Sequence, residues 1–229
     1  MENWICFTCE PGEPAWNMAA DQALLTQSAS FGVPVLRFYE WAKPAATFGY
    51  FQRHTEVEKM TALRPLVRRT TGGGVVPHER DWTYSLTIPP NHDWFRLKAE
   101  ASYRRMHAWL RDSLIPLGLN SELADCCNPV SPGQCFVGAE KHDLVHQGGK
   151  IAGAAQRRTK QGLMIQGSLQ LRNSNIERRG WEKSMIAIAG EAWGISFQSR
   201  ALSKDAVLMT TIRELAEQKF STDAHNRRR

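Results

Sequence analysis

The pattern of apolar and polar positions predicts helices separated by runs of strands. Residues 16–26 are rich in Ala and Leu and predict a helix. Residues 99–117 carry apolar side chains at three- and four-residue steps, the period of an amphipathic helix, and Gly118 follows as a stop signal. Near the end of the chain we expect Ser203 to cap a further helix, with Asp205 in its first turn.

Between the helices lie segments rich in aromatic and β-branched residues, each bounded by Gly, Pro or charged clusters. They cover residues 33–41, 46–50, 66–69, 82–88, 144–146 and 163–171. Because these strands follow one another rather than alternating strictly with helices, the order favours an α+β fold with a mixed, largely antiparallel sheet. We expect one domain over residues 1–229, with a basic tail at about residues 221–229.

Composition excludes several classes of protein. A hydrophobic content of 42% and a charged content of 23% are ordinary globular values, so a disordered chain, a collagen-like fibre and a coiled coil are excluded. No apolar run approaches the roughly 20 residues that a membrane helix needs. The first residues lack a basic stretch followed by an apolar one, so we expect no secretory signal and a cytoplasmic protein.

The formal net charge of +6 bears on whether the protein binds nucleic acid or an acidic protein. The three arginines at 227–229 supply half of that excess, and there is no signature of a nucleic-acid-binding module. An acidic protein partner suits the charge equally well, because opposite fields speed encounter. We therefore expect a protein partner and neither nucleic acid nor membrane.

A glycine run is the first candidate site. A predicted strand ends in three consecutive glycines at 72–74, with Arg69 before them and His78 after them. Glycine lets a ligand lie against the backbone, and exposed N–H groups there bind carbonyl, carboxylate or phosphate oxygens. The spacing matches neither the dinucleotide fingerprint nor the P-loop, and a plain flexible turn is the alternative.

A lysine and a cysteine are the next candidates. Lys150 enters a segment of very small residues, where a lysine holds an acyl carbonyl or stabilises an oxyanion; a solvated turn lysine is the alternative. Cys135 is a small buried hydrophobe by default and a nucleophile if a nearby cation favours its thiolate. Lys150 is the candidate cation if the two segments pair.

The other cysteines give a weaker signal. Cys6, Cys9, Cys126 and Cys127 supply enough sulfurs for zinc, but the last two are adjacent and lack the gap that lets both face one metal. We therefore expect thiols rather than disulfides, and no metal.

Four segments in register resemble the biotin/lipoate protein ligase family, which includes lipoate–protein ligases and octanoyl- or lipoyl-transferases. They are residues 17–25, 37–52, 68–78 and 149–156. The resemblance implies a single-domain fold shared with biotin ligases and class II synthetase cores. It implies that Lys150 holds the acyl carbonyl. It also implies a substrate-binding role for Arg69, Gly72, Gly73, Gly74, His78, Gly153, Ala154 and Ala155.

Cysteine placement distinguishes the branches of that family. In one transferase branch the nucleophile lies in a segment that corresponds to residues 162–167, which contain no cysteine. In another, Cys-Phe lies upstream of the lysine motif, and here Cys135-Phe136 precedes Lys150 by 15 residues. The chain is most similar to this cysteine-dependent octanoyltransferase branch. Our first hypothesis is transfer of an octanoyl or lipoyl group from acyl carrier protein, through a Cys135 thioester, to a lysine of a lipoyl domain or a glycine-cleavage H-type protein, without a cofactor.

Three departures from the family pattern keep two other hypotheses open. Residues 140–143 are similar to the ligases' version, so Asp143 is a candidate metal–nucleotide contact in an ATP- and Mg-dependent lipoate–protein ligase. Gln166 stands where the family often has His, and Gln22 replaces a usual Glu. These two substitutions motivate a third hypothesis, a non-catalytic binder of lipoate or of a lipoylated protein.

Overall fold

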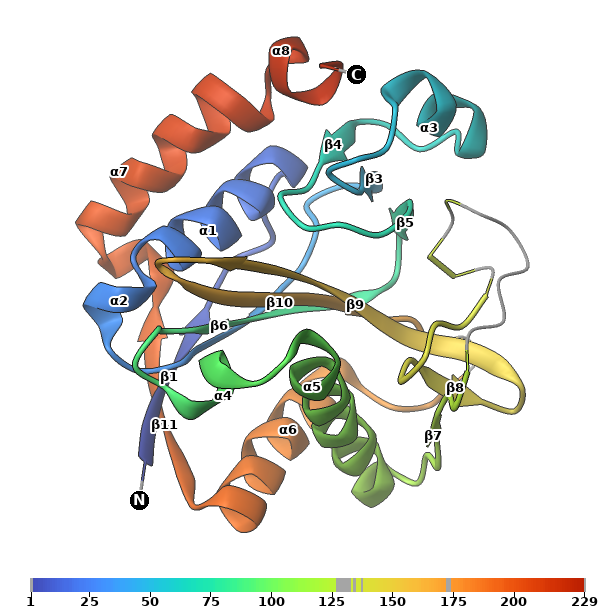
Figure 1. Cartoon of the computed structure of the whole chain (residues 1–229), viewed down its shortest axis with the longest axis vertical. Helices are drawn as coiled ribbons and strands as arrows, with labels where there is room; N and C mark the ends of the chain where they lie inside the picture. The colour runs from blue at the N-terminus through green and yellow to red at the C-terminus, as the bar shows by residue number, and fades with distance from the viewer. Residues whose placement is uncertain (1, 127–132, 134, 137, 172–173, 229) are drawn as a thin grey trace.

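The computed structural model describes residues 2–126, 133, 135–136, 138–171 and 174–228, and an eight-stranded sheet runs through its centre (Figure 1). The first three strands are parallel and the rest pair antiparallel, which confirms the predicted α+β fold with a mixed sheet. In order across the sheet they are β11 (Ile195–Ala201), β1 (Glu2–Thr8), β2 (Val35–Tyr39), β6 (Trp82–Ile88), β10 (Gly162–Leu169), β9 (Gly149–Thr159), β8 (Leu144–His146) and β7 (Glu122–Leu123).

A second sheet of three short strands lies beside the first (Figure 1). Its order is β4 (Leu66–Arg68), β3 (Ala45–Phe48) and β5 (Val76–His78), with α3 (His54–Met60) at its outer side. The glycine run at 72–74 connects β4 to β5. The two sheets therefore bring this loop close to β9 and β10.

Helices cover both faces of the large sheet (Figure 1). One face carries α5 (Ala99–Leu114) and α6 (Arg178–Trp193), and the other carries α1 (Pro14–Thr26) and α7 (Ala206–Leu215). The smaller helices are α2 (Ser28–Phe31), α4 (Asp93–Arg96) and α8 (Asp223–Asn226), with single turns at Ile115–Leu117, Leu202–Lys204 and Ala216–Phe220. None of the described helices combines the length and the apolar character that crossing a bilayer requires.

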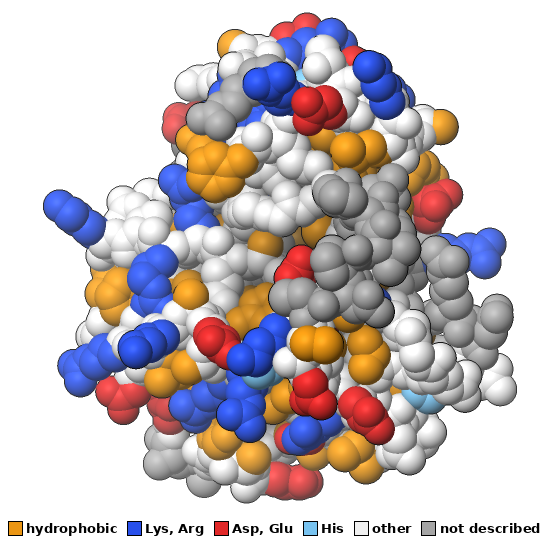
Figure 2. Space-filling view, turned by 45° about the vertical axis from the view of Figure 1, so that its right-hand side comes forward, with side chains coloured by type: hydrophobic (Ala, Val, Ile, Leu, Met, Phe, Trp, Pro, Cys, Tyr) orange, Lys and Arg blue, Asp and Glu red, His pale blue; other side chains and the backbone are white. Residues whose placement is uncertain are grey.

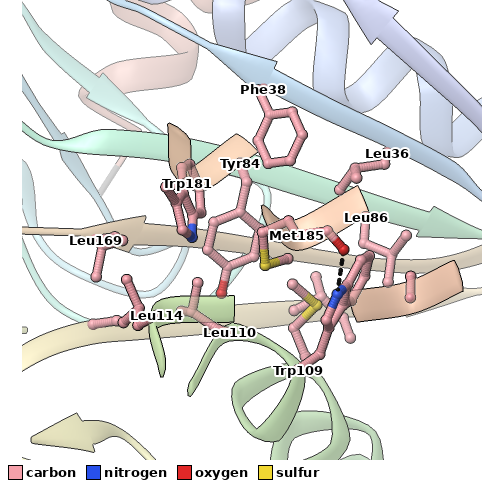
Figure 3. Packing of buried hydrophobic residues seen from close by; sticks show 14 of the residues in the cluster. Leu36, Phe38, Tyr84, Leu86, Trp109, Leu110, Leu114, Leu169, Trp181 and Met185 are labelled. Atoms are coloured by element: carbon pink, nitrogen blue, oxygen red, sulfur yellow. Dashed lines mark hydrogen bonds between the residues drawn. The ribbon is translucent and has the colours of Figure 1, made fainter. Parts of the chain in front are cut away.

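Two apolar cores follow from this layering. Alternate residues of a strand point to opposite faces, so Trp4 of β1 packs on the α5–α6 side while Ile5 packs on the α1–α7 side. Figure 3 shows the first core, where Tyr84 and Trp181 lie side by side. The indole of Trp109 donates to the carbonyl oxygen of Met185 at 2.8 Å and so ties α5 to α6.

Several predicted boundaries are confirmed and one cap is wrong. The strands over 82–88 and 144–146 have the predicted limits, and the helix beginning at residue 99 is present. Ser203 does not cap the last long helix, because Leu202–Lys204 form a separate turn. Asp205 is the cap instead: its carboxylate accepts the N–H of Leu208 at 3.0 Å, and α7 begins one residue later.

The segment suggested as a basic tail, residues 221–229, includes packed structure. α8 lies against β4, where the Asn226 side chain accepts the backbone N–H of Arg68 at 2.9 Å. The Arg68 guanidinium in turn donates to the carbonyl oxygens of His225 and Asn226. These bonds make residues 223–226 part of the domain.

We predict that stability falls as the pH drops below about 6.5, in part through His107 on α5. Burial lowers the pKa of His107 from 6.5 to about 4. Between these values the unfolded chain binds a proton at this ring and the folded chain does not, so acid favours unfolding. From pH 7 to pH 5 this group costs about 2 kcal/mol of the free energy of unfolding.

Urea titrations at both pH values measure this loss, and His107→Asn is the matched variant. An Asn amide can replace the ring N–H that reaches the carbonyl oxygen of His142 at 2.7 Å, but it does not titrate. The variant should lose less stability than the wild type on acidification. An equal loss of unfolding free energy in the wild type and the variant would contradict the assignment of this acid sensitivity to His107.

Candidate functional site

A cavity of about 190 Å³ lies between the two sheets. Figure 2 shows a face of the molecule that is hollowed near its middle, with Lys and Arg side chains gathered on one side of the hollow. Of the residues expected in the site, nine line the cavity: Arg69, Gly73, Gly74, His78, Cys135, Lys150, Gly153, Ala154 and Ala155. Gly72 and Asp143 stand just behind this lining, in contact with Arg69 and Lys150 respectively.

Lys150 is held by a buried ion pair. Its Nζ atom lies 2.7 Å from Oδ2 of Asp143, and the two side chains are 6% and 0% exposed. The hydroxyl of Tyr103 donates to the other oxygen of Asp143, and the backbone N–H of Glu140 donates to Oδ2 at 2.7 Å. Both oxygens of Asp143 therefore already accept hydrogen bonds, and a role as a metal–nucleotide contact would use the acceptor capacity that these bonds leave.

Tyr103 links this ion pair to the wall of the cavity. Its hydroxyl oxygen accepts the backbone N–H of Ala154 on β9 at 3.0 Å. Burial, and then the charge of Asp143, raise the pKa of Tyr103 well above its ordinary value, so the phenol stays protonated as a donor. The sequence analysis did not identify Tyr103, which lies on α5 at a position that the helical period explains by packing.

Gly153 explains why small residues follow the lysine. A Cβ at this position would lie 2.7 Å from both Nζ and Cε of Lys150 and 3.2 Å from Asp143. Lys150 is the second residue of β9, and its side chain extends past Gly153 to reach Asp143, so this segment of small residues around a lysine is a strand rather than a turn. β9 pairs with β10 over residues 152–159, and Lys150 itself pairs with Val145 of β8.

The glycine loop is packed tightly against β3. A Cβ on Gly49 would lie 1.8 Å from the carbonyl oxygen of Gly73, so only glycine fits there. Gly73 itself has a positive φ of 86°, which glycine tolerates without strain. The Arg69 guanidinium donates to the carbonyl oxygens of Gly72 and Gly74 at 2.9 and 3.0 Å, and so closes the loop.

Cys135 lies over this loop, and among the described residues its segment pairs with Val75 rather than with the strand that carries Lys150. Its backbone N–H donates to the carbonyl oxygen of Val75 at 3.1 Å, and the N–H of Val75 donates to Gly133 at 2.8 Å. The backbone N–H of Gly74 donates to the sulfur of Cys135 at 2.9 Å. The neighbouring Phe136 places its ring centroid 5.2 Å from Nζ of Lys150.

His78 forms a wall of the cavity with both ring nitrogens engaged. Nδ1 lies 2.8 Å from Asp81, Nε2 lies 2.7 Å from the hydroxyl of Thr47, and the ring stacks on Trp41 at 3.8 Å. Burial alone would raise the pKa of Asp81. The charge and hydrogen bond of His78, with the hydroxyl groups of Ser168 and Thr83, outweigh burial and hold that pKa below its usual value.

A buried polar network lies beneath the cavity, and Gln166 belongs to it. The Gln166 amide donates to Asp21 at 2.6 Å and accepts from the hydroxyl of Thr71 at 3.0 Å. Asp21 also pairs with Arg37 at 2.9 Å, both side chains being 1% exposed. Gln166, one of the two substitutions that motivated the binder hypothesis, therefore has a structural role. The sequence did carry a signal for the pair of Asp21 and Arg37, because each is a charged residue within an otherwise apolar segment.

Among the residues that the structure describes, no group of three or more His, Cys, Asp or Glu side chains could hold a metal ion. The donors that approach the cavity are instead cations, hydroxyl groups and backbone N–H groups. This set suits an uncharged or anionic oxygen and a thiolate better than a metal.

Comparison with known proteins gives a consistent result. A sequence profile of the lipoyl protein ligase A/B catalytic domain matches residues 13–227. The octanoyltransferase LipM of Bacillus cereus is 35% identical over 184 residues, which cover 74% of this chain and 66% of that protein. The octanoyltransferase LipM of Macrococcus caseolyticus is 32% identical over 181 residues, covering 73% of this chain and 66% of that protein. The chain thus spans slightly less than two thirds of the length of these relatives.

Solved structures share the fold over nearly the whole chain. A protein from T. acidophilum with bound lipoic acid superimposes with a TM-score of 0.81 at 22% identity, covering 100% of both chains. A lipoate-protein ligase A bound with ATP gives a TM-score of 0.79 at 22% identity, covering 99% of each chain. The similarity to these structures confirms the predicted fold.

We predict that Gly49→Ala displaces the glycine loop, because the new methyl group would overlap the carbonyl oxygen of Gly73. Overpacking of this kind should cost about 2 kcal/mol or more of the free energy of unfolding. The matched control is Gly72→Ala, where an added Cβ meets nothing within 4 Å and stability should change by about 1 kcal/mol or less. Denaturant titration compares the two variants, and equal costs would show that Gly49 is not a packing constraint.

Proposed function

This chain belongs to the lipoyl protein ligase A/B catalytic domain family, and we propose that it transfers an octanoyl or lipoyl group to a protein lysine through a thioester on Cys135. One observation carries the proposal: Cys135 lines the cavity, and a backbone N–H of the glycine loop donates to its sulfur. The relatives named octanoyltransferase support the same reaction class.

The first half-reaction loads the enzyme. The thiolate of Cys135 attacks the carbonyl carbon of an octanoyl thioester, a carbon–sulfur bond to Cys135 forms, and the bond to the donor's sulfur breaks. The donor leaves as a thiolate that takes a proton from solvent. Lys150, fixed as an ammonium by Asp143, is the group that stabilises the negative charge on the carbonyl oxygen in the transition state.

The second half-reaction transfers the acyl group from Cys135 to the acceptor. The neutral amine of a lysine on the acceptor attacks the same carbonyl carbon, an amide bond forms, and Cys135 leaves as a thiolate while the amine loses a proton to solvent. A thiol suits both steps because it is a good nucleophile and a good leaving group. No cofactor is needed, since the thioester of the donor supplies the free energy.

The apolar part of the cavity suits an acyl chain. Its wall is made of Met18, Val76, Ala154 and Ala155, with Gly73 leaving room beside the loop. These groups offer little hydrogen bonding, so burial of methylene groups would drive binding. Arg69 and His78 border this wall, where they would position the thioester end.

The donor would be acyl carrier protein and the acceptor a lipoyl domain or a glycine-cleavage H-type protein, all in the cytoplasm. One structure of similar fold is described as a bi-partite lipoate protein ligase from Thermoplasma acidophilum with its E2 lipoyl domain, with a TM-score of 0.75. A cationic surface beside the cavity suits an acidic carrier. Arg228 and Arg157 lie 3.9 and 5.4 Å over the ring of Tyr50, and burial, followed by these two arginines, lowers the pKa of Lys219.

An ATP- and Mg-dependent lipoate–protein ligase is the alternative, and a non-catalytic binder of lipoate or lipoylated protein is a further one. The shared fold with an ATP-bound ligase favours the first alternative. In this structure the carboxylate of Asp143, the candidate metal–nucleotide contact, is paired with Lys150. Pyrophosphate release that depends on lipoate and ATP would support the ligase, and acyl binding without transfer or adenylation would support the binder.

We predict that the protein forms a covalent octanoyl adduct when mixed with octanoyl-acyl carrier protein in the absence of ATP. Intact-protein mass spectrometry measures the adduct, which neutral hydroxylamine should remove because it is a thioester. Cys135→Ala should abolish the adduct. Cys126→Ala is the control, since this exposed thiol should not carry the acyl group. Full transfer by Cys135→Ala would refute the thioester mechanism.

We also predict that Arg228→Glu slows loading from octanoyl-acyl carrier protein several-fold at low salt, because it reverses a charge on the cationic surface. The difference should shrink as salt screens the interaction. Loading from a small octanoyl thioester should be unchanged. Lys204→Glu, an equal charge change on an exposed turn before α7, is the control. A defect that persists at high salt would point to the fold instead.

A further inference from the structure

We infer that Arg69, and not Lys150, is the cation that favours the thiolate of Cys135. The inference rests on the proposed function in one respect, namely that Cys135 is the nucleophile. It assigns separate roles to the two buried cations of the site: Arg69 acts on the sulfur and Lys150 acts on the acyl oxygen.

Lys150 already has an anionic partner. Its ammonium lies 2.7 Å from the fully buried carboxylate of Asp143. A cation and an anion in contact form a dipole, whose field falls off faster than that of a single charge. Lys150 is therefore a poor source of positive potential at a second anion, although its N–H groups can still donate to an oxygen.

Arg69 has no such partner. Its side chain is 5% exposed, and within the part of the chain that the structure describes it forms no ion pair with a carboxylate. Neutral oxygens surround it: the hydroxyl groups of Thr47 and Thr71 and the carbonyl groups of Gly72 and Gly74. A buried cation without a counter-ion is costly, and burial accordingly lowers the pKa of Arg69.

The nearest candidate counter-ion is the sulfur of Cys135. The position that a Cβ of Gly73 would occupy lies 3.3 Å from Nη2 of Arg69 and 3.4 Å from Sγ of Cys135, so both atoms face the same point of the loop. Gly74 joins them as well, because its carbonyl oxygen accepts from Arg69 and its N–H donates to the sulfur. The charge of a Cys135 thiolate opposes the effect of burial on the pKa of Arg69.

This arrangement has a consequence for the reaction. When Cys135 attacks the thioester, its negative charge moves to the acyl oxygen and then departs with the donor's sulfur. Arg69 is then buried without a counter-ion while the acyl group remains on Cys135. Release of the Cys135 thiolate in the second half-reaction restores the partner of Arg69, so this residue raises the fraction of thiolate before the attack and favours the departure of the sulfur afterwards.

Alkylation of Cys135 by iodoacetamide tests the assignment with the protein alone, because the thiolate is the reacting form. Peptide mapping by mass spectrometry separates Cys135 from the other thiols. Arg69→Gln removes the charge, Arg69→Lys keeps a cation, and Lys150→Gln removes the other cation. At pH 7 we expect Arg69→Gln to react about tenfold more slowly than the wild type, because the lost charge leaves a smaller fraction of thiolate. Arg69→Lys and Lys150→Gln should stay within about threefold of it.

Two comparisons guard against a change in fold or access. Above pH 10 the thiol is ionised in every variant, so equal rates there show that Cys135 remains equally accessible. If Arg69→Gln does not fold, Lys150→Gln decides: a tenfold loss at pH 7 overturns the inference, and an unchanged rate supports it. A tenfold loss in Lys150→Gln with none in Arg69→Gln overturns it outright.

The proposed function can fail separately from this inference. Absence of an octanoyl adduct would refute the acyl transfer while the dependence of alkylation on Arg69 stayed intact. An adduct that forms normally, with alkylation that depends on Lys150, would refute the role of Arg69 and leave the transferase standing.

Discussion

The hydrogen bonds that Arg69 donates to the carbonyl groups of Gly72 and Gly74 define the geometry of the site. They close the loop between the two sheets, and the closed loop presents the N–H of Gly74 to the sulfur of Cys135. The same guanidinium binds the hydroxyl of Thr47, which in turn contacts His78. One side chain therefore positions the loop that contacts Cys135 on one side and a wall of the cavity on the other.

This fold buries several charged side chains, and their burial costs free energy. Asp21 pairs with Arg37 beneath the cavity and Asp143 pairs with Lys150 at its wall, while Arg69 is surrounded by neutral oxygens. A buried ion pair is rarely more stabilising than apolar packing, and a single buried charge without a partner is destabilising. The two pairs and the lone guanidinium lie along one cavity, and such concentration of unfavourable electrostatics is typical of a functional site.

The sequence allowed several strands and several site residues to be predicted, but not the contacts between those residues. The residue pattern predicted the limits of β6 and β8 to the residue. The order of four motifs singled out the glycine loop and the lysine, and the spacing of Cys135-Phe136 before Lys150 singled out the cysteine. β9 was missed because Gly and Ala have low strand propensity, and pairing with β10 determines its conformation instead. The partners of the site residues come from distant elements, as with Tyr103 and Asp143, so only the tertiary structure shows them.

The contact of α8 with β4 bears on how the protein is made. It joins residues that are 158 positions apart, directly beside the segment that carries Arg69. Contacts of such long range form late, because the chain between them must first be ordered. During synthesis, residues 68–74 leave the ribosome long before residue 226 does. The nascent chain therefore completes the surroundings of Cys135 only after residue 226 has left the ribosome.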